Sequence, residues 1–542
     1  MPPPFSAILF RLNTVQNPTL FFCLHLITLR LRPFFSIISS LVGLAIAPGC
    51  VREQFFQPDA RPDASVALPI TADSVRGATA GRQYARHGGL YHALVGRHHR
   101  PTWAAPVAAP VLDLAIVRAG GLRPGKVGGG FNSTSLGLTG LDGHAYVLRT
   151  VDKDPVRAMP DWLRGTFLVN TLRDNISATN PYAGLVVPPL AEAAGVPHAS
   201  PRLFYVRADD PAFQTDSLRH FPGQLAYLEE KAAPLPPDAP APIAVVNSTK
   251  AFAAVYGGTA QIDQPALLRA RLLDAWLGDW DRHEGQWSWA VRPPAPAGIN
   301  LLAPLPKDRD MVFYRLDDGA LGWLVGHLAL RHWVTFGPRF AHVSQLLSSG
   351  HYLDVRGLNA LTRPQFRAAA AAMQQRLPNA LIAQAMQRLP AAAYALEGPR
   401  TTAALQQRRE ALPALADKLY LELARRPVVG GSAQAERFEI HRYADSTVVA
   451  VYPGSSTDTH QPALYRRAFL AAETQTIQLE GLGGDDTLLV TEHAPKTTAK
   501  PKVVFYGGSG NDELRGPANS RGIRFEQAAA PAKKAYDHPP KE

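Results

Sequence analysis

The chain has 542 residues, of which 46% are hydrophobic and 19% are charged, and its formal net charge at pH 7 is +11. This composition describes a globular protein with several hydrophobic cores, and it excludes disordered and collagen-like chains. The arginines and lysines are scattered and form no basic block interleaved with aromatic residues, so we expect no nucleic-acid groove. A basic surface of this kind suits an anionic membrane or a phosphorylated ligand.

The N-terminus has the pattern of an export signal. Arg30 and Arg32 precede an apolar run at 34–47, which is too short to span a bilayer and ends in Ala47-Pro48-Gly49-Cys50. This ending resembles a bacterial lipobox, in which the cysteine becomes the lipidated first residue of the mature protein. We expect residues 1–50 to be a signal peptide and Cys50 to anchor an exported lipoprotein in the cell envelope, at the outer membrane or in the periplasm. The alternative is a plain secretory signal whose cysteine is incidental.

Residues 51–110 are rich in alanine, arginine, proline and histidine and show little periodicity. We expect an extended tether there, with one short helix at 83–95. Four histidines fall in or near this helix without the fixed spacing of a metal site, so we expect them to face solvent. They are His87, His92, His98 and His99.

A β-rich lobe is expected over residues 111–235. A glycine-rich turn at Gly128-Gly129-Gly130 precedes a predicted hairpin that turns at Asp142-Gly143. The proline- and alanine-rich run at 232–243 is a natural linker to the next lobe. The pattern predicts strands at 135–141, 144–151, 201–206 and 224–229, and a helical stretch at 161–194.

Residues 236–426 are expected to form a mainly helical lobe. A predicted helix at 265–278 leads into Asp279-Trp280-Asp281. The sequence Thr362-Arg363-Pro364 has the threonine cap and early proline of another helix N-terminus.

The composition changes after Gly430-Gly431 to alternating strands. This change predicts a C-terminal β-domain over 427–527, followed by a disordered tail over 528–542. Together these elements predict an α+β protein with a β-rich lobe, a helical lobe and a separate β-domain.

Two acidic segments flank a predicted hairpin in the helical lobe: Asp279-Trp280-Asp281-Arg282-His283-Glu284-Gly285-Gln286 and Pro306-Lys307-Asp308-Arg309-Asp310. Phosphoryl transfer needs a carboxylate to accept the hydroxyl proton and oxygen ligands to hold magnesium. In kinases the base and the metal-binding amide lie five residues apart on one loop, as do Asp281 and Gln286. A hairpin then leads to the second metal-binding aspartate.

Asp281-Arg282-His283, with an amide at the fifth place, resembles the catalytic loop of atypical kinases such as the phosphoinositide 3-kinase-like and HipA-like families. The chain from about residue 111 also resembles a group of uncharacterised exported bacterial proteins. That group carries Gly-Asp-Trp-Asp-Arg-His-Glu-x-Gln-Trp and Pro-Lys/Arg-Asp-Arg-Asp. The resemblance implies a two-lobed kinase-like fold that binds ATP, or another nucleotide, and magnesium.

The resemblance also implies roles for single residues. Asp281 would be the general base, and His283 a supporting donor near the γ-phosphate. Gln286 and Asp308 would be metal ligands, with Asp310 competing for the role of Asp308. Gln286 departs from the usual asparagine, and its longer side chain moves the amide oxygen by about one methylene.

The β-rich lobe is expected to supply the phosphate-binding groups. The turn from Gly128, Gly129 and Gly130 to Ser133 can wrap phosphates with backbone N–H groups, although three glycines alone are more typical of a flexible hairpin. Arg149 occupies the strand position where kinases place a lysine. Lys126 and Lys153 are the alternatives for this role, and Glu192 is the nearest candidate for the partner glutamate.

The sequence is compatible with other functions. A catalytically inactive relative, serving as an envelope binding or scaffold module for a phosphorylated ligand, is slightly favoured by Gln286 and Arg149. A phosphoester hydrolase is less favoured, because the motifs of a dinuclear site are missing. We favour a phosphate or metal site over a surface loop anchored by tryptophans. Acceptor, nucleotide preference and oligomeric state are not predicted.

The C-terminal β-domain contains Gly507-Gly508-Ser509-Gly510-Asn511-Asp512, which fits the calcium-binding nonapeptide repeat of β-helical proteins, and residues 481–486 fit it less well. Calcium in such repeats is shared between stacked turns. Because two isolated copies cannot build that stack, we expect Gly-Asp turns of an ordinary β-sandwich, without calcium at Asp486 and Asp512.

Overall fold

The structure is a computed structural model that divides into two compact units, and all candidate site residues except Cys50 belong to the second. The first unit comprises residues 1–55 and Pro155–Asp174, and the second comprises Phe56–Asp154 and Asn175–Glu542. Cys50, Gly129, Gly130 and Ser133 lie outside the described residues, so the predictions that concern them stay untested. The structure describes residues 71–128, 134–235, 241–293, 298–328, 333, 335–340, 342–454, 462–494, 501–516 and 522–530.

The described part of the first unit is helical. It consists of η2 (Pro155–Ala158), η3 (Asp161–Leu163) and α4 (Leu168–Asp174). Within its described residues, the second unit contains helices and five sheets, so the α+β prediction is confirmed.

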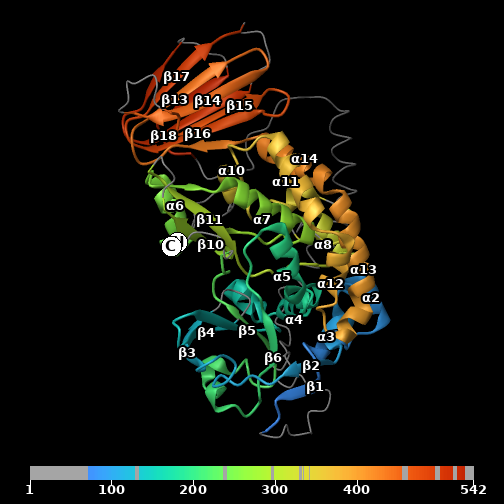
Figure 1. The fold of residues 1–542 in the computed structure, drawn as a ribbon. Helices are drawn as coiled ribbons and strands as arrows, with labels where there is room; N and C mark the ends of the chain where they lie inside the picture. Colours follow the sequence, from blue (N-terminus) through green and yellow to red (C-terminus); the bar gives the residue numbers. More distant parts are fainter. Residues whose placement is uncertain are drawn as a thin grey trace, which may run out of the picture. The chain divides into compact units, whose positions relative to one another are not determined.

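A five-stranded antiparallel sheet forms the β-rich region that carries Arg149 (Figure 1). Its strands pair in the order β3-β4-β5-β7-β6, and helix α5 (Ala183–Ala194) lies between β5 and β6 in the sequence. The predicted hairpin is confirmed, because β4 pairs antiparallel with β5 across a turn where Gly143 has φ 76°. The strands are β3 (Leu122–Gly128), β4 (Ser135–Gly140), β5 (Ala145–Thr150), β6 (Arg202–Tyr205) and β7 (Leu225–Glu230).

Alternate residues of these strands build the core beneath the sheet. Leu136 and Leu138 of β4 and Leu148 of β5 are buried in one hydrophobic cluster. Because side chains alternate between the two faces of a strand, the residues between them face away from this core. Arg149 follows Leu148 and is thereby directed to the opposite face.

The segment 71–110, predicted as part of an extended tether, is folded. Tyr84 and Trp103 are buried with ring centroids 4.8 Å apart, and His98 and His99 are buried as well. The expectations of a tether and of solvent-facing His98 and His99 are therefore wrong for these residues. The elements are β1 (Ser74–Ala78), η1 (Arg82–Ala85), α2 (Gly89–Val95), α3 (Arg100–Ala104) and β2 (Val107–Pro110).

A second sheet and a buried helix carry the two acidic segments. Helix α7 (Gln264–Leu277) begins at Asp263, whose side chain accepts a hydrogen bond from Ala266 N, and ends at Gly278 with φ 77°. Both ends match the prediction closely. The sheet pairs in the order β8-β10-β11-β9. Its strands and the helix before β9 are β8 (Ala244–Asn247), α6 (Ser248–Tyr256), β9 (Ala260–Ile262), β10 (Trp287–Arg292) and β11 (Asn300–Pro306).

Helices continue from the acidic turn to the C-terminal domain. The predicted N-terminus at Thr362 is confirmed by a capping box, in which the Gln365 side chain accepts a hydrogen bond from Thr362 N at 2.7 Å. The helices are α8 (Ala320–Leu328), α9 (Val343–Leu346), α10 (His351–Gly357), α11 (Arg363–Arg376), α12 (Asn379–Met386), α13 (Ala391–Glu410) and α14 (Leu412–Ala424).

Two sheets face each other across the core of the C-terminal β-domain (Figure 1). In one sheet β12, β16, β18 and β20 are all parallel, and in the other β13, β17 and β19 are parallel. The expectation of an ordinary β-sandwich is wrong, because this pairing stacks successive coils of the chain. The strands are β12 (Val428–Gly430), β13 (Glu436–Arg442), β14 (Ser446–Pro453), β15 (Tyr465–Leu470), β16 (Thr476–Gly483), β17 (Thr487–Glu492), β18 (Lys502–Ser509), β19 (Glu513–Arg515) and β20 (Ile523–Glu526).

Within the described ranges, no helix has both the length and the apolar character needed to pass through a bilayer.

Candidate functional site

A small cavity of about 100 Å³ lies between the five-stranded sheet and the acidic turn that follows β11. The sheet contributes Arg149 and Glu229, and the residues just after β5 contribute Lys153. The acidic turn contributes Asp308 and Asp310. Groups of both charges, about 160 residues apart in the sequence, therefore share one cleft.

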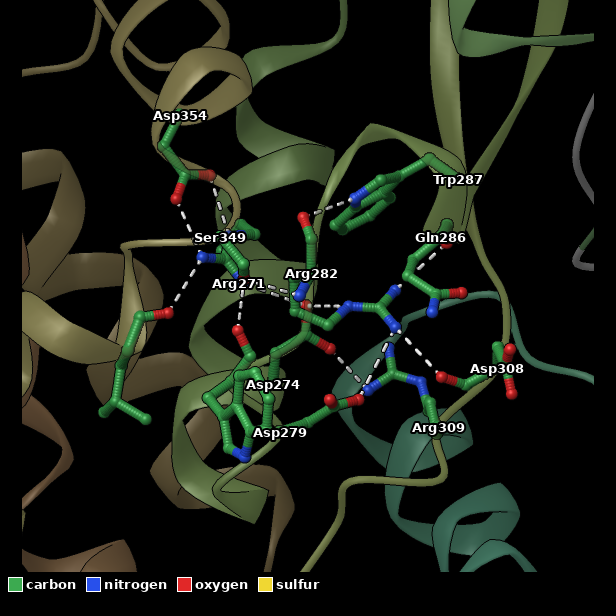
Figure 2. Close-up of polar contacts among 12 residues, drawn as sticks. Arg271, Asp274, Asp279, Arg282, Gln286, Trp287, Asp308, Arg309, Ser349 and Asp354 are labelled. Carbon is green, nitrogen blue, oxygen red and sulfur yellow. Dashed lines mark hydrogen bonds and ion pairs between the residues drawn. The ribbon is translucent and has the colours of Figure 1, made fainter. Parts of the chain in front are cut away.

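The hairpin brings the Asp281 loop and the acidic turn together. Strand β10 pairs antiparallel with β11, and Trp287 lies opposite Pro306. One step beyond this pair, Lys307 N donates to Gln286 O at 2.9 Å. Gln286 and Asp308 consequently lie on adjacent strands of chain, as Figure 2 shows.

Ion pairs connect the sheet to the acidic turn. Arg149 Nη1 lies 2.9 Å from Asp308 Oδ2, and its Nε lies 3.3 Å from Glu229 Oε1. Lys153 forms an ion pair with Asp310. Arg149 is therefore held by the carboxylates of β7 and of the acidic turn. The expected glutamate partner, Glu192, is exposed on α5 instead.

The pKa values of Asp308 and Asp310 are shifted in opposite directions in this environment. Burial alone would raise the pKa of Asp308, but Arg149 and Lys153 outweigh it and lower the pKa to about 2. Burial raises the pKa of Asp310, and the neighbouring Asp308 charge raises it further. Asp308 is therefore the stronger candidate for a permanently ionised ligand.

Asp281 stands apart from these ion pairs. Its side chain is half-buried and forms no hydrogen bond or ion pair within the part of the chain that the structure describes. Burial raises its pKa, His283 opposes this change, and Asp310 and Asp308 add to it. Asp281 therefore interacts electrostatically with Asp308 and Asp310. A carboxylate with free oxygens and a raised pKa is suited to accept a proton.

His283 and Gln286 end the same loop in different environments. The His283 ring is exposed, and its Nδ1 accepts a hydrogen bond from Gly285 N at 3.0 Å, which caps η7 (Glu284–Gln286). The Gln286 side chain is only 9% exposed, and its amide forms no hydrogen bond with the described residues. An amide without a protein partner is free to receive a ligand.

Arg282 holds both acidic segments in place, a role that the sequence did not reveal (Figure 2). It is fully buried and donates to the backbone oxygens of Lys307 at 2.8 Å and Gln286 at 3.3 Å. Its Nε also lies 3.1 Å from Asp274 Oδ2 on α7, and its guanidinium stacks on Trp287. One side chain thereby joins the helix, the loop and the acidic turn.

Further buried charges surround Asp274 (Figure 2). Arg309 donates to Asp274 Oδ1 at 2.5 Å, and Arg271 bridges Asp274 and Asp354. Burial would raise the pKa of Asp274, but the arginines outweigh it and lower the pKa. Arg271 and Asp274 interrupt an apolar helical sequence, and this interruption was the one signal that could have revealed the network.

Asp279 is the least satisfied member of the network. It is 1% exposed, and its Oδ1 has no hydrogen-bond partner among the described residues. Burial raises its pKa well above the ordinary value, although Arg282 opposes this change. Asp279 thus supports the loop from inside and does not face the cleft.

Arg408 stabilises the C-terminal end of α7. It donates to the carbonyl oxygens of Trp276 at 2.7 Å and Ala275 at 2.6 Å, and it stacks on Phe340. Burial lowers its pKa to about 9, which leaves the guanidinium charged at neutral pH. A cation at this end of a helix satisfies the last carbonyls and complements the helix dipole.

The described end of the glycine-rich turn lies in register with Arg149. Gly128 pairs with Ser135, and Ser135 pairs with Arg149. These three residues form one row across the sheet, at about 4.8 Å per strand. Lys126, the alternative to Arg149, is exposed on β3 and does not line the cavity.

Magnesium would fit this site only together with other ligands. Among the described residues, no group of three or more histidines, cysteines, aspartates and glutamates is arranged to hold a metal ion. Asp308 and the unpaired amide of Gln286 offer two oxygen ligands. This donor set suits Mg²⁺, which usually takes one or two protein ligands and completes its shell with water and phosphates.

The chain matches no protein-family model, no curated protein and no solved structure.

Proposed function

We propose that the chain is a kinase-like phosphotransferase that binds a nucleoside triphosphate and Mg²⁺ between a β-rich lobe and a helical lobe. The single observation that carries this proposal is the acidic turn: it bonds to the Gln286 backbone, its Asp308 pairs with Arg149 in the cleft, and its charges act on Asp281. The two acidic segments alone are common in proteins. Their meeting beneath a sheet that presents a cation is the arrangement that phosphoryl transfer requires.

The order of the parts along the chain supports this proposal. Arg149 lies on β5, the third strand of the five-stranded sheet, which is the strand where protein kinases place the phosphate-binding lysine. The Asp281 loop, a hairpin and Asp308 then follow in the order of the kinase catalytic loop and its metal-binding aspartate. The proposed kinase-like fold rests on this order and on the resemblance of the Asp281 loop to atypical kinases.

Each candidate side chain in or near the cleft has a proposed task. Asp308 and Gln286 would hold Mg²⁺, which supplies positive charge against the phosphates when bound. Arg149 and Lys153 are paired with Asp308 and Asp310 in the structure. In the complex they would also donate hydrogen bonds to the phosphate oxygens. Asp281 would orient the acceptor hydroxyl and take its proton.

The proposed transfer balances without a further reactant. The acceptor oxygen forms a bond to the γ-phosphorus, while the bond from that phosphorus to the β,γ-bridging oxygen breaks. The nucleoside diphosphate leaves with the bridging oxygen and its electron pair, and the acceptor proton passes to Asp281. His283 is exposed, so its proposed part is limited to steadying the loop and contacting the bound nucleotide at the rim.

A second function is a binding or scaffold module that holds a nucleotide or phosphorylated ligand without catalysis. The ion pair between Arg149 and Asp308 favours it, because a metal ligand that is already neutralised gains less from Mg²⁺. The long side chain of Gln286, in place of the usual asparagine, also favours a module without catalysis. In either case we propose an exported lipoprotein that Cys50 anchors to a membrane of the cell envelope, in keeping with the exported protein group it resembles.

Phosphate transfer separates the two functions. The chain would be incubated with γ-labelled ATP, Mg²⁺ and a panel of protein, sugar and lipid hydroxyl acceptors. We expect labelled product or autophosphorylation, lost in Asp281→Asn and kept in the exposed control Asp216→Asn. Nucleotide binding without any transfer would favour the scaffold, and absence of both would contradict the proposed function.

A further inference from the structure

The stacked coils of the C-terminal β-domain place three acids in one column. Glu436, Asp486 and Asp512 each open the second strand of a coil or immediately precede it. Each follows a glycine by five residues, namely Gly431, Gly481 and Gly507. The coils are in register, since Leu482 pairs with Gly508 and Gly483 pairs with Ser509. The same turn therefore recurs in successive layers.

One oxygen of each aspartate connects the layers. Glu436 N donates to Asp486 Oδ1 at 2.7 Å, and Asp486 N donates to Asp512 Oδ1 at 3.1 Å. Gln527 ends this ladder, because its side-chain oxygen accepts from Asp512 N at 3.3 Å. An amide suffices at the end of the ladder. A hydrogen-bonding ladder by itself therefore does not require carboxylates in the middle.

The second oxygen of each aspartate lacks a partner. Asp486 is 1% exposed and Asp512 is 8% exposed, and the Oδ2 atom of each has no hydrogen-bond partner among the described residues. No lysine or arginine of the described chain forms an ion pair with them. Leaving a buried carboxylate oxygen unpaired is costly, so this arrangement calls for a proton or a cation.

The glycines make room for these free oxygens. A Cβ atom on Gly481 would overlap Asp486 Oδ2 and would lie 2.6 Å from the Gly507 carbonyl oxygen. A Cβ atom on Gly507 would overlap Asp512 Oδ2 in the same way. The two turns thus direct carboxylate and carbonyl oxygens into a space that any larger residue would fill.

The electrostatics of the column favour a positive ligand. Burial raises the pKa of Asp486 to about 7, and the Glu436 and Asp512 charges contribute, although the hydrogen bond from Glu436 N opposes the change. Glu436 is satisfied by Ser432, whose N donates to it at 2.9 Å. Asp486 and Asp512 are therefore the two acids of the column that keep an oxygen without a partner.

We propose that Ca²⁺ binds between the turns of residues 481–486 and 507–512. The Oδ2 atoms of Asp486 and Asp512 and the carbonyl oxygen of Gly507 would be ligands, with water and further turn carbonyls completing the shell. Calcium accepts six to eight oxygens in flexible geometry and uses backbone carbonyls readily, whereas magnesium demands a small octahedron. This site is separate from the proposed nucleotide cleft and does not depend on it.

Calcium binding to the full chain tests this proposal. After treatment with EDTA and removal of the chelator, the chain would be titrated with CaCl₂ by calorimetry, and its thermal unfolding would be followed with CaCl₂ or MgCl₂. We expect Ca²⁺ to bind and to raise the unfolding temperature by several degrees, and Mg²⁺ to do so much less. Asp486→Asn and Asp512→Asn keep the shape of the side chains and should each weaken Ca²⁺ binding at least tenfold.

One further variant serves as the control. Glu513→Gln, on the exposed strand β19, should bind Ca²⁺ as the unaltered chain does. Absence of Ca²⁺ binding by the unaltered chain would overturn the proposal. Ca²⁺ binding by Asp486→Asn and Asp512→Asn as tight as that of the unaltered chain would overturn it as well. If Asp486→Asn does not fold, Asp512→Asn and the Ca²⁺ titration of the unaltered chain still decide.

Discussion

Arg282 donates from Nη1 to the carbonyl oxygen of Lys307 at 2.8 Å, and this bond fixes the acidic turn against the Asp281 loop. The two residues lie on opposite sides of the β10–β11 hairpin. Arg282 is fully buried, so its bonds are shielded from water and its removal would leave several acceptors unpaired. The middle residue of the Asp-Arg-His motif therefore acts as a structural support for the two catalytic candidates beside it.

Replacing Arg282 should destabilise the second unit strongly. In Arg282→Met, Asp274 loses one of its partners and the backbone oxygens of Lys307 and Gln286 lose their donor. Breaking a buried charge pair costs about 3–5 kcal/mol. Urea denaturation followed by tryptophan fluorescence would measure this loss. Arg388→Met, at an exposed position, should change stability by no more than ~0.5 kcal/mol, and an equally small change for Arg282→Met would contradict the proposed support.

Removing Arg149 should affect ligand binding more than folding. Arg149→Ala leaves the Asp308 charge less compensated, so the pKa of Asp308 should rise from about 2. We expect nucleotide affinity to fall ~10-fold or more, because charge-assisted contacts to phosphate contribute about 1.5–3 kcal/mol each. Fluorescent-nucleotide titration would measure the affinity. Lys126→Ala on the exposed part of β3 is the control, and equal losses for both variants would argue against Arg149 as the phosphate ligand.

Glu397 should make stability depend on acidity. It accepts hydrogen bonds from His99 Nδ1 at 2.6 Å and from Thr102 and Asn180. Burial would raise its pKa, but His99 outweighs burial and lowers the pKa below the ordinary 4.5. The folded state then binds fewer protons, so the contribution of Glu397 is complete above pH 4.5 and is lost as the pH falls through the folded pKa.

Denaturation of the unaltered chain and Glu397→Gln between pH 3 and pH 7 would reveal this effect. The stability difference should be largest near neutral pH and should shrink below pH 4.5. A difference that stayed constant over the whole range would show that the carboxylate charge of Glu397 contributes nothing.

Truncating Arg408 should loosen the end of α7. Arg408→Ala removes the donor for Ala275 and Trp276 carbonyls and leaves space between the rings that it contacts. We expect a loss of about 1–3 kcal/mol from the unpaired carbonyls, measured by thermal unfolding. Because α7 leads directly to Asp279, hydrogen exchange should also increase at residues 275–282. Unchanged hydrogen exchange at these residues would show that Arg408 does not help to position the loop.

Local patterns predicted the elements well where neighbours in sequence decide the structure. The β4–β5 hairpin follows from alternating residues around Asp142-Gly143. Helix α7 follows from the amphipathic pattern at 265–278, and Asp263 and Gly278 cap it in the structure. The pairing of Arg149 with Glu229 was missed, because it depends on which strand lies beside β5.

Long-range relationships explain the other errors. His99 was predicted to face solvent because its partner Glu397, almost 300 residues away, could not be inferred from the sequence. The stacking of Asp486 on Asp512 was rejected because two repeats alone cannot form a stack, but Glu436 and Gln527 complete the ladder without the repeat motif. No role was predicted for Arg282, because only its burial reveals the network around Asp274.

Magnesium-dependent nucleotide binding tests the central claim most directly. Calorimetric titration of ATP into the chain, with Mg²⁺ or with EDTA, should show binding that Mg²⁺ strengthens at least tenfold. Asp308→Asn should abolish this strengthening, while Asp216→Asn should retain it. Equal affinity in Mg²⁺ and EDTA, or equal strengthening in Asp308→Asn, would contradict a shared site for metal and nucleotide at the acidic turn.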